Sequence, residues 1–243
     1  MKQPSIIRSG WWVALAAVVL TLAVGAVLVA PLFTRSPHAS PSSDFDLTEI
    51  SVKRDLVVRA MHRDGVMALN GPAMVDGAEV DRFNREERGK MLVSEDRVIG
   101  VEIAGDARAY PLRLMRWHEV VNDVIGGEAV AVTYSPLCDS VAVFNRDIEG
   151  VEVDLGVSGL LYNSNTLLYD RRSGPAASPL WIQLTGQPLS GGEPGAPPPL
   201  RARRASLSTW AEWRNRHPTT TVLAPLAEMK KPYKRDPFNS YFG

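Results

Sequence analysis

Hydrophobic and polar positions divide the chain into a long apolar run near its start, a polar linker and a region of short alternating segments. Residues 11–33 carry no charged side chain over 23 positions, enough for a helix to cross a bilayer core of about 30 Å. Positive charge precedes this run at Lys2 and Arg8. Because cytoplasmic flanks are enriched in Lys and Arg, the pattern predicts a cytoplasmic N-terminus at residues 1–10 and a single-pass transmembrane anchor at 11–33.

The alternative is a cleaved signal peptide, whose apolar core normally spans about 7–15 residues and ends in a small-x-small site. The run here is longer, and Pro31 follows Ala30 where cleavage would fall. We therefore expect an uncleaved anchor in the cell membrane. Residues 34–43, rich in Pro and Ser, predict a linker. Residues 44–243 are then one globular domain outside the cytoplasm.

Within residues 44–243 the spacing of apolar side chains predicts mostly short strands. Residues 98–103 and 107–111 alternate around a Gly-containing turn and predict a hairpin. A helix is expected to begin at Pro111 and to place His118 and Val121 on one face. The other elements expected are strands at 130–135, 141–146, 151–161 with bends at Gly156 and Gly159, 166–170, 180–184 and 219–223, a helix at 79–90, and a short helix that opens with a capping box at 209–212.

This order of elements predicts an α+β fold that is β-rich, with a mostly antiparallel sheet or a partly open barrel and two or three short helices. The periodic apolar faces predict that Trp117, Val132, Phe144 and Trp181 are buried. A polar corner at residues 134–140 separates two apolar strands. Loops on a buried scaffold are where proteins usually present reactive groups, so this corner is the first place to look for a site.

Composition fits a globular protein that can bury a core, with 45% hydrophobic and 22% charged residues. The formal net charge is zero, and the chain has no basic run with interleaved aromatic residues, so we expect no nucleic-acid partner. Cys138 is the only cysteine. The chain therefore cannot form an internal disulfide, and it cannot provide the several thiolates of a cysteine-rich zinc site.

Cys138, in the corner, and His118, on the expected helix, are the first candidate pair. A Cys–His pair can form an activated nucleophile or provide two ligands to a soft metal. Met115, three residues before His118, would share its helix face and add a third soft ligand. The alternative is structural: Cys138 packs as a small hydrophobic side chain, and His118 is a hydrogen-bonded helix residue. The residues alone favour the structural interpretation.

Two further polar clusters join the candidate site. Glu119 adjoins His118, and Asn122 lies about one helical turn after it. An amphipathic helix with one polar edge is the alternative to a binding cluster there. Residues Tyr162, Asn163 and Ser164 form a polar segment between apolar strands, which could bind a ligand through hydroxyl and amide groups. The segment could equally be a turn, since Asn and Ser favour turns through local hydrogen bonds.

From about residue 64 to its C-terminus, the chain resembles the prokaryotic domain-of-unknown-function family 3179. The segments that carry the resemblance are VIGVEIAGDARAYPLRLMRWHEVVND, VAVTYSPLCDSVAVFNR, GVSGLLYNSNTLLYDR and LWIQLTG. Members typically have T-Y-C-P-L-C where this chain has TYSPLC, so Ser135 replaces the first cysteine. If the family's C-x-x-C is a redox or metal dithiol, this chain lacks the resolving thiol and the two-thiolate copper site. If the motif is structural, Ser135 is a near-isostere.

These observations support two functional hypotheses. The first is a membrane-anchored extracytoplasmic binding or accessory module, with a pocket for a small molecule near Cys138, His118 and residues 162–164. The second is a thiol- or metal-dependent protein, of copper or redox type, that uses Cys138 and His118. The sequence leaves open whether the protein is an enzyme, which cofactor it uses and which protein partner it contacts.

Overall fold

The computed structural model describes residues 45–86, 90–174, 178–190, 195–229, 233, 235, 237 and 238. All of them belong to one unit of the chain, Ser40–Gly243. The N-terminus expected at 1–10, the anchor expected at 11–33 and the linker expected at 34–43 lie outside the described residues. Of the helices that are described, none is both long and apolar enough to cross a membrane.

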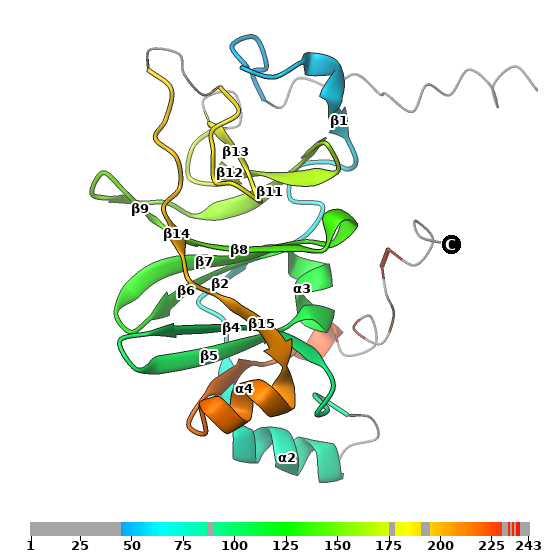
Figure 1. Cartoon of the computed structure of the whole chain (residues 1–243). Coiled ribbons are helices and arrows are strands. Elements are labelled where there is room, and N and C mark those ends of the chain that lie inside the picture. The colour runs from blue at the N-terminus through cyan, green and yellow to red at the C-terminus, as the bar shows by residue number, and fades with distance from the viewer. Residues whose placement is uncertain are drawn as a thin grey trace, which may run out of the picture. The chain divides into compact units, whose positions relative to one another are not determined.

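Three sheets form the body of this unit (Figure 1). Sheet A has the order β1 (Val57–Arg59), β11 (Leu155–Tyr162), β12 (Asn165–Asp170), β13 (Leu180–Ile182). Sheet B has the order β14 (Ala202–Arg203), β8 (Ser140–Asn145), β7 (Glu128–Ser135), β6 (Val120–Ile125), β2 (Leu69–Asn70). Sheet C has the order β15 (Ser206–Thr209), β4 (Arg97–Ile103), β5 (Asp106–Pro111), β16 (Thr221–Leu223), β3 (Met74–Asp76), and β9 (Asp147–Ile148) and β10 (Val151–Glu152) form a separate hairpin.

The described helices are short. They are α2 (Gly77–Glu86), α3 (Leu112–His118) and α4 (Trp210–Arg216), with 3-10 turns η2 (Arg54–Leu56), η3 (Pro136–Cys138) and η4 (Ala227–Met229). Strands pair antiparallel except β2 with β6 and β5 with β16. The fold is therefore a sheet-rich α+β fold with three short helices, as predicted, and the strands in the described ranges form stacked open sheets and no closed barrel.

Sheet B lies between the other two sheets because both of its faces are apolar. Val130 and Val132 of β7 pack with Ile99 of sheet C. Ala131, between them on the same strand, packs with Leu168 of sheet A. Alternate side chains of a strand point to opposite faces, so β7 is buried on both sides, which explains its apolar run from Ala129 to Val132. Helices α2 and α4 cover the other face of sheet C (Figure 1).

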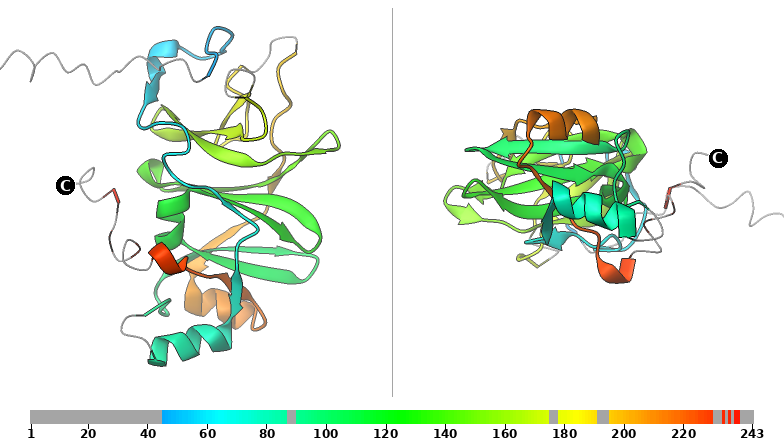
Figure 2. Two further views of the ribbon diagram at one scale, coloured as in Figure 1. Left: turned by 180° about the vertical axis from the view of Figure 1, so that it is seen from behind. Right: turned by 90° about the horizontal axis from the view of Figure 1, so that it is seen from below.

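Two segments, which we call the straps, run across the stack and complete its edges. Residues 57–76 supply β1 to sheet A, β2 to sheet B and β3 to sheet C, each at the end of its sheet. Residues 202–209 supply β14 and β15 at the opposite ends of sheets B and C. The first strap runs down the back of the stack in cyan in the left view of Figure 2, and the second runs down the front in orange in Figure 1.

Several local sequence signals are confirmed. β4 and β5 form the expected hairpin, and Thr209 and Glu212 form the capping box that begins α4. The bend expected at Gly159 is a bulge with φ of +80°, where an added Cβ would lie 2.4 Å from the Met61 carbonyl oxygen. Of the four side chains expected to be buried, three are: Val132, Phe144 and Trp181. Trp117 is half-buried against the core between sheets B and C.

The helix expected from Pro111 is shorter than predicted. It ends at His118, Glu119 takes a φ of +56°, and the chain continues as strand β6. Asn122 therefore lies on a strand, and the prediction that it shares a helix face with His118 was wrong. The reason is that β6 pairs with β7 along its whole length, and the β-branched Val120 favours a strand.

Candidate functional site

The polar corner after β7 is a single 3-10 turn held by its neighbours. Pro136 fixes its own φ at the start of the turn, and the turn ends at Asp139 with φ of +46°. The Tyr134 hydroxyl donates a 2.8 Å hydrogen bond to Asp139, and Arg97 forms an ion pair with the same carboxylate at 3.1 Å. These contacts fix the direction in which Cys138 leaves the end of the strand.

Cys138 is exposed at this corner, and its sulfur faces polar partners. Asn165 donates a hydrogen bond to the sulfur at 3.1 Å, and the Ser140 hydroxyl oxygen lies 3.1 Å from it. Burial raises the pKa of the Cys138 thiol, but its hydrogen bonds with Ser135, Ser140 and Asn165 outweigh burial and lower the pKa below its ordinary value. A thiol of lowered pKa and open access is more nucleophilic than a free cysteine at neutral pH.

His118 is fully buried, and both of its ring nitrogens have partners. Its Nδ1 lies 2.8 Å from the Met67 carbonyl oxygen and its Nε2 lies 2.5 Å from the Tyr233 hydroxyl oxygen. The carbonyl can only accept, so in the neutral ring Nδ1 carries the proton. Burial lowers the pKa of His118. Within the described part of the chain no hydrogen bond joins His118 to Cys138.

The three soft-metal ligands considered from the sequence, Met115, His118 and Cys138, have different partners in the structure. Met115 is fully buried in the core between sheets B and C. Both nitrogens of His118 are already hydrogen-bonded, whereas Cys138 faces the amide of Asn165. Among the described residues, no group of three or more His, Cys, Asp or Glu side chains lies close enough to hold a metal ion.

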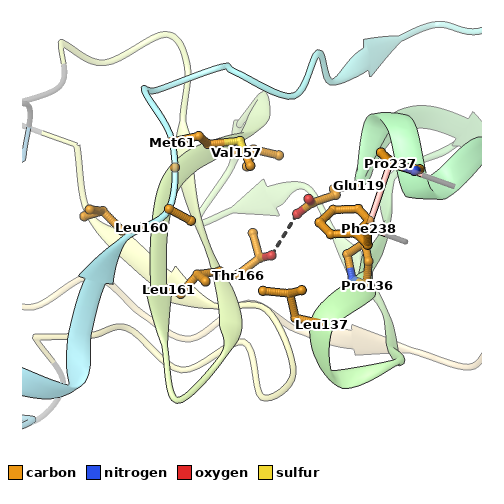
Figure 3. A pocket seen from close by; sticks show the side chains of 12 residues that line it. Met61, Glu119, Pro136, Leu137, Val157, Leu160, Leu161, Thr166, Pro237 and Phe238 are labelled. Carbon is orange, nitrogen blue, oxygen red and sulfur yellow. Dashed lines mark hydrogen bonds between the residues drawn. The ribbon is translucent and has the colours of Figure 1, made fainter. Parts of the chain in front are cut away.

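A cavity of about 380 Å³ lies next to the corner (Figure 3). Most of its walls are apolar, and they include Met61, Leu137, Val157, Leu160, Leu161 and Phe238. Of the described residues that line it, only Glu119 and Thr166 have polar side chains. The cavity therefore combines apolar walls with one carboxyl group and one hydroxyl group.

Contacts with α3 bring the C-terminal residues to this cavity. The Trp117 indole N–H donates a 3.2 Å hydrogen bond to the carbonyl of Arg235. Tyr233, which bonds His118, is buried beside it with the two rings in an edge-on arrangement. Phe238 then lines the cavity, so one of its walls comes from the end of the chain.

Glu119 reaches the cavity from the junction of α3 and β6. Its N–H donates to the Met115 carbonyl at 2.7 Å, and its carbonyl accepts from the Tyr134 N–H at 2.8 Å. The residue is only 3% exposed. Burial raises the pKa of the Glu119 carboxyl group to about 7, against an opposing hydrogen bond from Thr166. A buried carboxyl that titrates near neutrality in a cavity marks a candidate functional group.

Ser135 belongs to a hydrogen-bonded chain that ends at Glu119. The Thr166 hydroxyl donates to the Glu119 carboxylate at 2.7 Å, and the Ser135 hydroxyl oxygen lies 3.2 Å from the Thr166 hydroxyl oxygen. Ser135 also accepts the Thr166 backbone N–H at 3.1 Å. Because Thr166 gives its proton to the ionised carboxylate, Ser135 is the donor to Thr166 in that state. Ser135 is therefore linked to Glu119 by way of the Thr166 hydroxyl.

The remaining candidate residues have structural partners. Asn122 is buried and donates to the Leu155 carbonyl at 2.8 Å, which ties sheet B to sheet A. Tyr162, at the end of β11, leads into Asn163 and Ser164, which both have positive φ and form the tight turn between β11 and β12. The structure therefore brings Glu119 and Ser135 together and places Cys138 on the adjacent turn. The segment 162–164 does not line the cavity.

Sequence reasoning missed Thr166 and Phe238. Thr166 is 31 positions after Ser135 and 47 after Glu119, and nothing in the local pattern connects them. The one available signal was Glu119 itself, an acid placed directly before the apolar residues of a strand. Acidic side chains are seldom buried without a partner, so that position pointed to a carboxyl group with a special role.

The fold and the cavity define a three-sheet α+β domain with an apolar pocket that contains one buried carboxyl group. The chain belongs to the family described as protein of unknown function (DUF3179), which it matches over residues 63–242. The resemblance stated from the sequence is thereby confirmed. Neither the curated proteins nor the solved structures contain a match to this chain.

Proposed function

We propose that the protein is a membrane-anchored extracytoplasmic binding module whose cavity at Glu119 holds a small, largely apolar molecule. The observation that carries this proposal is the cavity itself. Its volume of about 380 Å³ falls in the range of about 300–1,000 Å³ that is common for ligand sites. Such sites are lined mainly by apolar side chains with a few placed polar groups, which is the arrangement of Leu161, Phe238 and Glu119.

The sequence supports the membrane anchor and the external location in this proposal. Residues 11–33 are uncharged, and positive charge precedes them, so the binding domain is expected on the outer side of the membrane. Reporter fusions after residue 44 and at the C-terminus test this topology. Both should report an external location, and release of a soluble cleaved product would refute the anchor.

Filling the cavity tests the binding function. We expect 1-hexanol, a small apolar molecule with one hydroxyl group, to bind the full chain in lipid nanodiscs, measured by calorimetry against empty nanodiscs. Leu137→Trp should abolish this binding, because Leu137 lines the cavity. The matched variant Leu184→Trp should leave it unchanged, because Leu184 is 54% exposed and lies outside the cavity lining. Equal binding by the two variants would contradict the proposed site.

A thiol-dependent function is the second candidate, and it rests on Cys138. The sulfur is exposed and its pKa is lowered, both of which favour reaction. Metal analysis of the purified full chain beside a Cys138→Ser variant tests the metal form of this function. Stoichiometric metal that disappears with the substitution would favour it over the binding module.

A further inference from the structure

Glu119 presents a negative charge to the cavity without a cationic partner among the described residues. Its only side-chain hydrogen bond there comes from Thr166, at 2.7 Å. Among the described residues, burial and that single hydrogen bond are what shift its pKa. A buried carboxylate is costly unless a cation or several hydrogen bonds accompany it. In the described part of the cavity, a positively charged group beside Glu119 would therefore stabilise the carboxylate.

The remaining walls suit a cation that carries an apolar body. The ring of Phe238 lines the same cavity as Glu119 (Figure 3), and the face of an aromatic ring attracts ammonium groups. Leu160, Leu161 and Val157 offer only hydrocarbon. Gly159 adds no side chain, and a Cβ there would collide with the Met61 carbonyl oxygen. The part of the cavity beside Glu119 and Phe238 thus favours a positively charged group of the ligand, and the remaining walls favour an apolar chain.

We infer that the ligand of this cavity is a small monocationic amine with an apolar body, held by an ion pair between its ammonium group and Glu119. This inference rests on the proposed binding function and specifies the class of ligand. The Thr166 hydroxyl, which donates to Glu119, fixes one carboxylate oxygen and leaves the other for the ammonium. A neutral ligand of the same size would fill the apolar part but leave the carboxylate unpaired.

Hexylamine and 1-hexanol, which share one apolar chain and differ in charge, test the inference on the full chain in lipid nanodiscs. Calorimetry at pH 8, above the pKa of Glu119 of about 7, should give a dissociation constant at least about tenfold lower for the amine, the usual advantage of a charge-assisted hydrogen bond. Glu119→Gln should remove this preference and retain hexanol binding. Glu149→Gln, at an exposed turn position, should leave both constants unchanged.

The outcomes separate this inference from the proposed function. If wild-type protein binds the two probes equally, the cavity is a binding site but the cationic ligand is refuted. If it binds neither at millimolar concentration, the binding function itself fails and the inference fails with it. The ratio of the two dissociation constants is measured on the wild-type protein, so the test stands even if Glu119→Gln does not fold. Near-ultraviolet circular dichroism checks that the variant retains its packing.

Discussion

Replacing Glu119 with Gln should stabilise the fold above neutral pH. The carboxyl group has a pKa of about 7 in the folded protein against 4.5 for an ordinary glutamate. A raised carboxyl pKa means that the folded state holds the proton more tightly than the unfolded state. The contribution of this group to stability is therefore greatest below about pH 4.5 and is lost as the pH rises through 7, where the folded protein must carry a buried charge.

The size of the effect follows from the same two values. Each pH unit between them corresponds to about 1.4 kcal/mol, so the ionised side chain costs the fold up to about 3 kcal/mol above pH 8. Gln keeps the shape and accepts the Thr166 hydrogen bond, but it carries no charge. We expect the free energy of unfolding of Glu119→Gln to exceed that of the wild type by about 2–3 kcal/mol at pH 8 and to match it near pH 4.

Guanidinium unfolding of the full chain in nanodiscs, followed by tryptophan fluorescence across this pH range, measures the difference. Glu149→Gln provides the control, since that side chain is exposed and should change stability by less than about 0.5 kcal/mol. A constant difference between Glu119→Gln and the wild type at all pH values would refute the reasoning. It would mean that the carboxyl group is paired or hydrated in the folded protein.

Three other predictions concern the corner, the core and a helix start. Cys138 should react with a disulfide reagent at neutral pH faster than a free cysteine of pKa about 8.5. Asn165→Ala should slow this reaction by removing a hydrogen bond to the sulfur, whereas Asn215→Ala should not. An inert Cys138 would mean that the corner is purely structural. Phe144→Ala should lower the free energy of unfolding by about 3–5 kcal/mol, because the ring is 1% exposed between sheets A and B; a loss within measurement error would contradict the packing. Thr209→Ala should lower the free energy of unfolding by about 1 kcal/mol, because it removes the capping box. The same unfolding assay measures this loss. An equal loss for Thr219→Ala, which caps no helix, would count against that explanation.

Local patterns in the sequence predicted much of the fold. The capping box at Thr209 and the hairpin around Gly105 depend on residues within a few positions of each other, so their signals survive in the sequence. The apolar run of β7 also predicted a buried strand, although the sequence does not state which sheets cover it. The helix boundary at His118 was missed because the pairing of β6 with β7 overrides a helical spacing that continues to Val121.

The candidate site was only partly predictable for the same reason. Cys138 and Glu119 were visible as residue types in a polar corner and beside a histidine. Their surroundings come from β12 and from residues near the C-terminus, which are distant from them in the sequence. The contact between Glu119 and Thr166, and the place of Phe238 in the cavity wall, are products of tertiary packing that no local pattern encodes.

The two straps also bear on how long the folded protein lasts. The strands β4–β5, β6–β8 and β11–β12 pair with sequence neighbours and can form while the rest of the chain is still open. The straps pair with strands far away in the sequence: β1 joins β11, and β15 joins β4. Contacts of such separation are expected to form late in folding, after the rate-limiting step, because closing a long loop costs chain entropy. Substitutions in the straps should accordingly accelerate unfolding and leave the refolding rate almost unchanged, so that the straps determine how long the folded protein lasts rather than how quickly it forms.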